Sequence, residues 1–271
     1  MICFSRSCQT SNVRYRSFQY RSFQNVPNSG LSSIGESRFD VYLKEQKCDF
    51  KTKNIAVAGS TASEWYSGSY LDDLKKNAAN HDYLWLTLMG NDALETMPSC
   101  ASAGHTPEEC GDQLEKDMLN KMGTILDDIH EVNPNLQIVG FGYDTMFGGL
   151  GCELLCKTIF PQCWKESNVT SPIECFNTQF IRIQGIWDKL ASTRSDYVTA
   201  INILGTTQMA GGDEGVTIGH PDMTKLGPSA YWPDYYGCIH PSLLSTKHDG
   251  SGAMLIMHQF YEQYWSKTLG C

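Results

Sequence analysis

The sequence predicts an α/β protein in which helices cover both faces of a parallel sheet. Short apolar runs alternate along the chain with longer segments of helical periodicity. Some of these runs are apolar almost without interruption, which is typical of parallel strands buried on both faces. Turn-forming or polar residues follow three of them, at Gly59, Asn91 and Asp144. We therefore expect a single-domain three-layer α/β/α sandwich with a binding site at the carboxyl ends of its strands.

Four apolar runs are predicted to form the strands. In chain order they are residues 54–58, 82–89, 136–143 and 197–204. The run 82–89 is the clearest case of a strand without a polar face. We expect the connections between these strands to be right-handed.

Five segments are predicted to form helices: residues 37–46, 70–79, 107–132, 176–193 and 250–267. The segment 107–132 is the longest, and Pro107 suits its first turn, where a missing N–H costs nothing. Glu108 and Glu109 follow at the positive end of the helix dipole. Apolar residues recur at helical spacing along this segment and should face the core; they are Leu114, Met118, Met122, Leu126 and Ile129.

Eleven cysteines favour disulfides and hence an oxidising compartment. Residues 98–110 are predicted to form a loop that brings Cys100 and Cys110 together. The group from Cys152 to Cys175 lacks the paired Cys-x-x-Cys spacing of zinc sites, so we interpret it as a disulfide-linked lid. A metal-binding protein using this group is a weaker alternative. Asn168 is a glycosylation acceptor by its motif.

Charge and apolar content exclude several classes. A formal net charge of −9 argues against a nucleic-acid surface. No apolar run approaches the ~20 residues of a membrane helix. Residues 1–36 are predicted to be an irregular arm, with a tandem Tyr-Arg-Ser-Phe-Gln repeat at 15–24, and residues 37–271 to be the folded domain. The first residues lack the apolar core of a signal peptide. Either the protein is not secreted, or its true start lies upstream. From the cysteine content and the glycosylation motif we expect the second, a secreted or lumenal protein.

Three short motifs carry the functional interpretation. The first is Asn54-Ile-Ala-Val-Ala-Gly59-Ser60, where an apolar run turns into a helix start at a glycine. Main-chain N–H groups exposed at such a turn bind an anion or a transient oxyanion. The second is Gly90-Asn91-Asp92, and the third is Gly237-Cys-Ile-His240-Pro241 ahead of the last helix.

In this order and at this spacing, the three motifs resemble the GDSL or SGNH family of serine esterases and lipases. The resemblance extends from about Ser37 to the end of the chain. It implies the flavodoxin-like sandwich of that family and an ester hydrolase that uses no cofactor. It also implies that the Gly59 N–H and the Asn91 amide stabilise the oxyanion, and that His240 is the general base.

The family's nucleophile block has a poor counterpart here. Aligned by position, Ser7 takes the place of the nucleophile, with Ser5 and Arg6 where the family has glycine and aspartate. Asp234 is the carboxylate nearest to His240 on its N-terminal side, and we assign it as the third member of the triad. His220-Pro221 is a rival to His240, while Ser60, Ser63 and Cys8 are rivals to Ser7. The remaining histidines are expected on the surface or in helices.

Two functions follow from this resemblance. The first is a carboxylic ester hydrolase whose substrate is a small ester, a lipid or an acetylated glycan. The second is a catalytically inactive protein of the same fold that binds a glycan or a lipid. Nucleic acid is not an expected partner, and the oligomeric state stays open.

Overall fold

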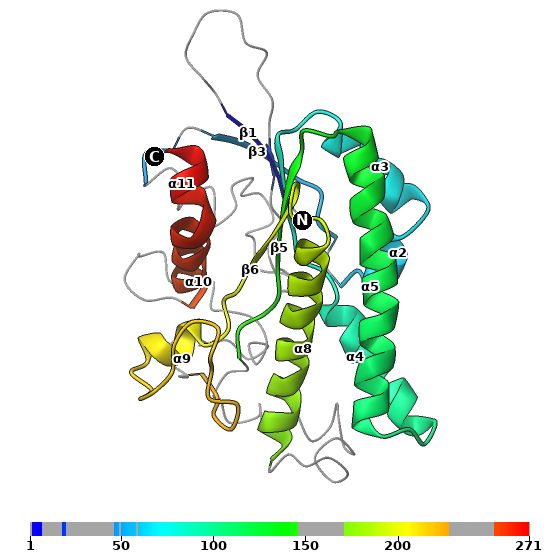
Figure 1. Ribbon diagram of the computed structural model, residues 1–271, viewed down its shortest axis with the longest axis vertical. Coiled ribbons are helices and arrows are strands. Elements are labelled where there is room, and N and C mark those ends of the chain that lie inside the picture. The colour runs from blue at the N-terminus through cyan, green and yellow to red at the C-terminus, as the bar shows by residue number, and fades with distance from the viewer. Residues whose placement is uncertain are drawn as a thin grey trace, which may run out of the picture.

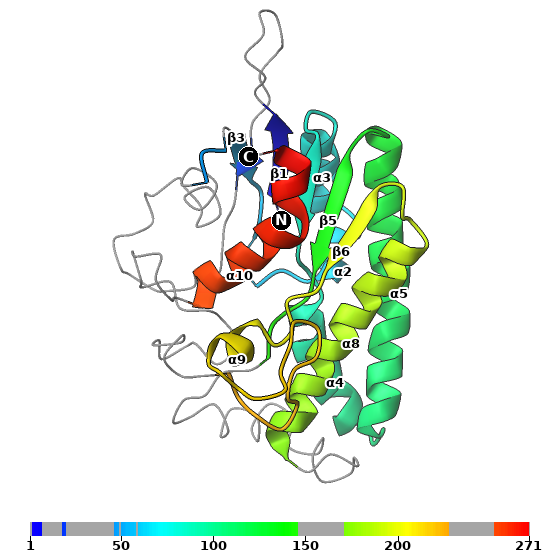
Figure 2. The same cartoon turned by 60° about the vertical axis from the view of Figure 1, so that its left-hand side comes forward.

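The computed structural model describes residues 2–6, 18–19, 46–48, 50–57, 59–145, 171–227 and 252–270. Within these ranges the chain forms a six-stranded sheet in the order β2-β3-β1-β4-β5-β6. Helices α3, α5 and α8 lie on one face of this sheet, and the C-terminal helix lies on the other (Figures 1 and 2). The predicted α/β class, with helices on both faces, is confirmed.

The strands are β1 (Ile2–Arg6), β2 (Phe18–Gln19), β3 (Phe50–Asn54), β4 (Tyr83–Leu86), β5 (Gln137–Phe141) and β6 (Val198–Ile201). Strands β4, β5 and β6 pair in parallel, as predicted. Strand β1 is antiparallel to both β3 and β4, which the sequence did not indicate. The sheet is therefore mixed, with a three-stranded parallel part.

The strand predicted at residues 54–58 is wrong in position. The strand β3 ends at Asn54, and residues 55–57 have no regular structure. Lysines alternate with Phe50, Thr52 and Asn54 in β3. This pattern is typical of a strand with one solvent-exposed face. The prediction relied on a continuous apolar run, and that signal marks only strands covered on both sides.

The helices are α2 (Ala62–Trp65), α3 (Ser69–Ala78), α4 (Gly90–Ser102), α5 (Pro107–Val132), α8 (Pro172–Ser192), α9 (Thr206–Ala210), α10 (Gly252–Phe260), the π-helix η2 (Tyr261–Trp265) and α11 (Ser266–Leu269). Four predicted helices are confirmed, and the fifth falls at 37–46, of which only residue 46 is described. Helix α4 is a correction, because residues 98–102 were predicted to be loop. Pro98 lies inside this helix, where it removes one backbone hydrogen bond without ending the helix.

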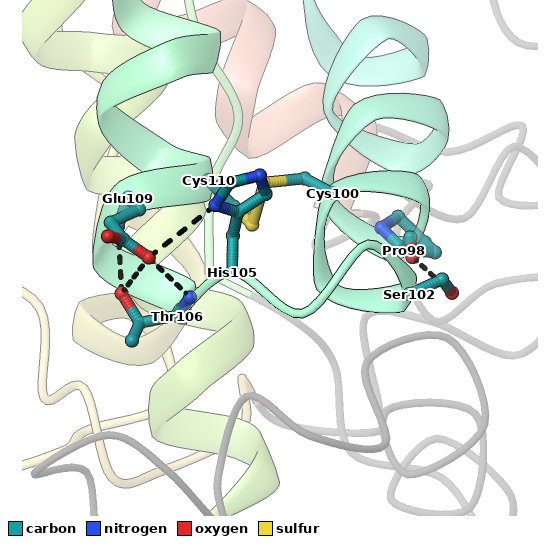
Figure 3. Close-up of a disulfide and its surroundings, with 7 residues drawn as sticks. All are labelled: Pro98, Cys100, Ser102, His105, Thr106, Glu109 and Cys110. Atoms are coloured by element: carbon teal, nitrogen blue, oxygen red, sulfur yellow. Dashed lines mark hydrogen bonds and ion pairs between the residues drawn. A yellow bond between two sulfur atoms is a disulfide. The ribbon is translucent and has the colours of Figure 1, made fainter.

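Helix α5 begins with a capping box. The Thr106 hydroxyl accepts a hydrogen bond from the Glu109 N–H, and the Glu109 carboxylate accepts one from the Thr106 N–H (Figure 3). The predicted disulfide joins Cys100 at the end of α4 to Cys110 in α5, with the two Cα atoms 5.6 Å apart. Both the cap and the disulfide hold the short turn between the helices.

Two further cysteines, Cys48 and Cys175, are disulfide-bonded. The Cys175 sulfur is therefore not a thiolate ligand, which argues against the metal-binding interpretation of its group. The described part of the chain contains no cluster of three or more metal-ligating side chains. None of its helices is long and apolar enough to cross a membrane.

The core centres on Trp85 of β4. Its ring makes edge contacts with Phe141 of β5 and Phe260 of α10, at centroid distances of 5.1 and 4.4 Å. Trp265 packs against Trp85 from η2 at 6.2 Å. These aromatic contacts join the C-terminal helix to the central strands. The five core positions predicted along α5 are all buried.

Ion pairs connect α5 to α8 and to the segment that follows α8. Arg194 binds Asp127 with both its Nε and Nη2, at 2.6 and 2.8 Å. Tyr197 donates a hydrogen bond to the same carboxylate at 2.6 Å. Toward the other end of α5, Arg182 pairs with Asp112 at 2.9 Å. The hydrogen bond from Arg194, supported by Tyr197, holds the pKa of Asp127 below its ordinary value.

Replacing Asp127 by asparagine is expected to lower the free energy of unfolding at pH 7 by about 1 kcal/mol, because the carboxylate is partly exposed. A lowered pKa in the folded state contributes stability above the ordinary pKa of 3.8, and this contribution is lost as the pH falls through the lowered value. The difference between wild type and variant should therefore shrink in urea titrations below about pH 4. Asp117→Asn is the control, since the hydrogen bond that Asp117 accepts within the described residues comes from the neutral Gln113. A difference independent of pH would contradict the charge argument.

Candidate functional site

The carboxyl ends of β3 and β4 lie at the same edge of the sheet. Asn54, the last residue of β3, pairs with Ile2 of β1, and Ile2 also pairs with Trp85 near the end of β4. Since both strands are antiparallel to β1, they run in the same direction. The turn that carries Gly59 and the helix start that carries Asn91 therefore leave the sheet at one edge.

Gly59 has the properties of an anion-binding turn residue. Its φ is +77°, and a Cβ built on it would meet nothing within 4 Å. The residue is exposed. Among the hydrogen bonds within the described ranges, none is donated by its N–H. As far as the described ranges go, this N–H is left for an external acceptor.

The neighbouring Ser60 fixes the shape of this turn. Its hydroxyl donates to the Val57 carbonyl at 2.8 Å and accepts from the Trp65 indole N–H at 2.7 Å. The residue is 9% exposed. Both hydrogen bonds of the Ser60 hydroxyl therefore help to hold the turn.

Asn91 joins the start of α4 to this turn. Its Nδ2 donates a hydrogen bond to the Ser60 carbonyl at 3.0 Å. An amide nitrogen carries two hydrogens, so one remains for another acceptor. The structure thus brings Gly59 and Asn91 together, although the roles assigned to them remain predictions.

Asp92 links the start of α4 to the start of α2. Its buried carboxylate accepts the Ala62 N–H at 2.7 Å and the Ser63 N–H at 3.3 Å, which caps the start of α2. The Ser63 hydroxyl lies 3.3 Å from the same carboxylate and accepts a hydrogen bond from Lys121 at 2.8 Å. No local pattern in the sequence indicates these contacts of Asp92, because its partners lie 29 and 30 residues away.

The backbone is strained where β4 leads into α4. Met89 has a φ of +84°, in the left-handed region that non-glycine residues rarely adopt. The Tyr143 ring then lies directly over Gly90, where any Cβ would overlap it. Burial raises the pKa of Tyr143 to about 12, and the charge of Asp92 adds to the rise. The phenol is therefore neutral at physiological pH.

A second buried carboxylate lies after β5. Asp144 accepts hydrogen bonds from the N–H groups of Thr145, Gly205 and Thr207 at 2.8, 2.6 and 2.8 Å, and from the Thr207 hydroxyl at 2.7 Å. Burial raises the pKa of Asp144 to about 6, and the hydrogen bonds from Thr207, Thr145 and Gly205 oppose this rise. The sequence placed Asp144 at a strand end, but no pattern in it indicated these partners.

The fold is similar at low sequence identity to solved lipase structures. A GDSL-like lipase from Parabacteroides merdae matches with a TM-score of 0.44 and 17% identity, over 78% of this chain and 72% of that one. An extracellular lipase from Streptomyces rimosus matches with a TM-score of 0.44 and 16% identity, over 81% and 84%. Similarity of this degree assigns neither a family nor an activity. No family model matches the chain, and no curated protein matches it significantly.

Three residues of the predicted site, Ser7, Asp234 and His240, lie outside the described residues. Strand β1 leads toward the first of them. Its last residue, Arg6, pairs with Phe50 at the beginning of β3. The carboxyl end of β1 is thus at the edge opposite the one that carries Gly59 and Asn91.

The rival base His220 is described and exposed. Its main chain forms a bridge with Thr217, and the Gly219 N–H donates to the Leu204 carbonyl at 2.8 Å. These hydrogen bonds tie its loop to the region after β6. The expectation that all other histidines are on the surface or in helices is wrong for His81, which is buried and has its Nδ1 2.5 Å from the Asn77 carbonyl.

Proposed function

We propose that this protein is a carboxylic ester hydrolase of the SGNH or GDSL type. The observation that carries the proposal is the hydrogen bond from Asn91 to the Ser60 carbonyl. It holds the amide against the turn whose exposed Gly59 N–H is available to an acceptor. Donors held in advance at one point are what a tetrahedral oxyanion requires.

The reaction would use groups assigned from the motif order. The Ser7 hydroxyl attacks the ester carbonyl, and His240, oriented by Asp234, takes the hydroxyl proton and transfers it to the leaving alcohol. The Gly59 N–H and the Asn91 amide bind the oxygen that becomes negative. Water then attacks the acyl carbonyl while His240 accepts its proton. The bond to the Ser7 oxygen breaks, His240 returns the proton to that oxygen, and the carboxylic acid leaves. No cofactor enters this scheme.

An inactive protein that binds a glycan or a lipid is the second candidate. The direction of β1 favours it, because the carboxyl end of that strand lies opposite Gly59 and Asn91. Ser60 is already committed to the turn, and Ser7 lies outside the described residues. The nucleophile therefore needs a test separate from that of the oxyanion donors.

The disulfide-bonded state of Cys48, Cys100, Cys110 and Cys175 supports a place outside the reducing cytosol. We infer a secreted or lumenal protein. A thiol titration of unfolded, unreduced protein from its native source checks this, since these four sulfurs should not react.

Replacing Asn91 by alanine is expected to lower kcat on a p-nitrophenyl short-chain ester by about 100-fold, with KM little changed, because the donor acts on the transition state. Asn133→Ala is the matched control. Asn133 also donates from its amide to main-chain carbonyls, those of Ala78 and His81, but next to the start of β4. That variant should lose stability without a selective loss of kcat.

His240→Ala and Ser7→Ala complete the test. Loss of activity in both supports the assigned pair, and loss in His240→Ala alone moves the nucleophile to another residue. A wild-type protein without ester turnover that binds phosphatidylcholine vesicles or an acetylated oligosaccharide by calorimetry would establish the second candidate instead. Equal kcat in wild type and Asn91→Ala would refute the oxyanion assignment.

A further inference from the structure

A polar network at the ends of β5 and β6 is not used by the proposed chemistry. Its centre is Asp144, whose carboxylate receives four hydrogen bonds from Thr145, Gly205 and Thr207. Three of these bonds come from residues at the start of α9, 61 and 63 positions further along the chain. Asp144 therefore attaches α9 to the end of a neighbouring strand.

The network continues from α9 into the loop that follows it. The Gln208 side chain donates to the carbonyls of Asp222 and Lys225 at 2.9 and 3.0 Å, and accepts from the Asp222 N–H at 2.9 Å. From α8, the Asn177 amide donates to the carbonyls of Met223 and Lys225 at 3.0 and 3.1 Å. Both amide side chains are buried, which makes these bonds costly to break.

This arrangement leaves the loop little freedom. Residues 205–210 are attached to β5 through Asp144, and residues 222–225 are attached to α9 and α8. Between them, Gly205 lies so close to the main chain of Thr217 and Pro221 that a Cβ would come within 3.0 and 3.3 Å of it. The stretch 205–227 is thus positioned relative to the parallel strands, and Asp144 links its start to the end of β5.

We propose that Asp144 is a positioning residue, which sets the place of residues 205–227, the segment that precedes Asp234 and His240 in the chain. The inference rests on the proposed function, in which His240 is the base. Asp144 acts through α9 and Gln208, not on the substrate. Its role needs a carboxylate, because an amide would turn an NH₂ group toward at least one of the four donors. With a pKa of about 6, the group is ionised at neutral pH.

Three variants test this role: Asp144→Asn, Thr207→Val and the conservative Thr207→Ser. Hydrogen exchange measured by mass spectrometry should be about tenfold faster in peptides covering 205–227 of Asp144→Asn, and unchanged in α5. Its kcat on the p-nitrophenyl ester should fall by about 10- to 100-fold, with KM changed less, as expected for a displaced catalytic group. Thr207→Val should show a smaller effect of the same kind, and Thr207→Ser should match wild type because it keeps the hydroxyl.

Asp127→Asn is the control, because the ion pair of Asp127 lies at the opposite edge of the sheet. This variant should leave both the exchange rates in 205–227 and kcat unaltered. Wild-type exchange rates in 205–227 of Asp144→Asn would overturn the positioning role, as would faster exchange with an unchanged kcat. If Asp144→Asn does not fold, the contrast between Thr207→Val and Thr207→Ser decides by the same two readouts. A wild-type protein without ester turnover overturns the proposed function and this role together, whereas unchanged exchange overturns the role of Asp144 alone.

Discussion

Replacing Gly140 by alanine is expected to lower the free energy of unfolding by about 3 kcal/mol, the upper end of the usual cost of overpacking a core. Gly140 lies in β5, and the indole of Trp187 from α8 packs directly on its Cα. A Cβ there would lie 2.6 Å from Trp187 Cδ2 and closer still to Cε3 and Cζ3. Trp187 is fully buried, so its rigid ring has no space into which it can move. The helix or the strand must therefore shift.

Urea denaturation followed by circular dichroism measures this loss. The matched control is Gly185→Ala, because Gly185 lies in α8 near Trp187 and has nothing within 4 Å of a built Cβ. That variant should gain up to about 1 kcal/mol from the better helix propensity of alanine. The loss of stability in the double variant Gly140→Ala/Trp187→Leu should be smaller than the sum of the losses in the two single variants. A wild-type midpoint for Gly140→Ala would show that α8 does not pack on β5 as described.

Replacing Gly90 by alanine is expected to abolish most ester turnover, with a loss in kcat of about 100-fold, and to cost about 2 kcal/mol of stability. A Cβ on Gly90 would lie 2.5 Å from Cζ and 2.7 Å from Cε2 of Tyr143, inside the ring's contact distance. Relief requires that the ring or the start of α4 move. Because Asn91 is the next residue, its amide would leave the position set by the Ser60 carbonyl.

Steady-state kinetics on the p-nitrophenyl ester measure the loss of kcat, and a thermal melt measures the loss of stability. Gly111→Ala is the control: its Cβ would lie 2.5 Å from Cζ of Arg182, but that guanidinium ends a flexible side chain and can move aside. We expect wild-type kcat and nearly unchanged stability for it. If Gly90→Ala folds and keeps full activity, the position of Asn91 is not important for the reaction.

Local signals were sufficient for much of the fold. Helix α5 was predicted with its observed bounds because Pro107 and the following glutamates mark its start, and its apolar period continues to the end. The pairing of Cys100 with Cys110 follows from a short separation of 10 residues. The meeting of Gly59 and Asn91 also follows from the sequence, since parallel strands place their carboxyl ends at one edge. The roles of Ser7, Asp234 and His240 stay predictions.

Other features depend on neighbours that no local pattern identifies. Pro98 suggested a loop, yet the helix α4 continues past it to Ser102. Strand β3 was missed because its lysines break the apolar run, although it pairs with β1 on one side and β2 on the other. The antiparallel direction of β1 depends on its partners β3 and β4, which lie far along the chain.

By itself, the sequence determined the alternation of strands and helices, the start of α5 and the turn chemistry at Gly59 and Asn91, because each depends on residues close together in the chain. Only the tertiary structure decided the direction of β1 and the partners of the buried carboxylates. Asp92 caps α2, and Asp144 holds Gly205 and Thr207. A buried charge is stabilised by whichever donors the fold brings to it, and the order of strands in the sheet determines which donors those are.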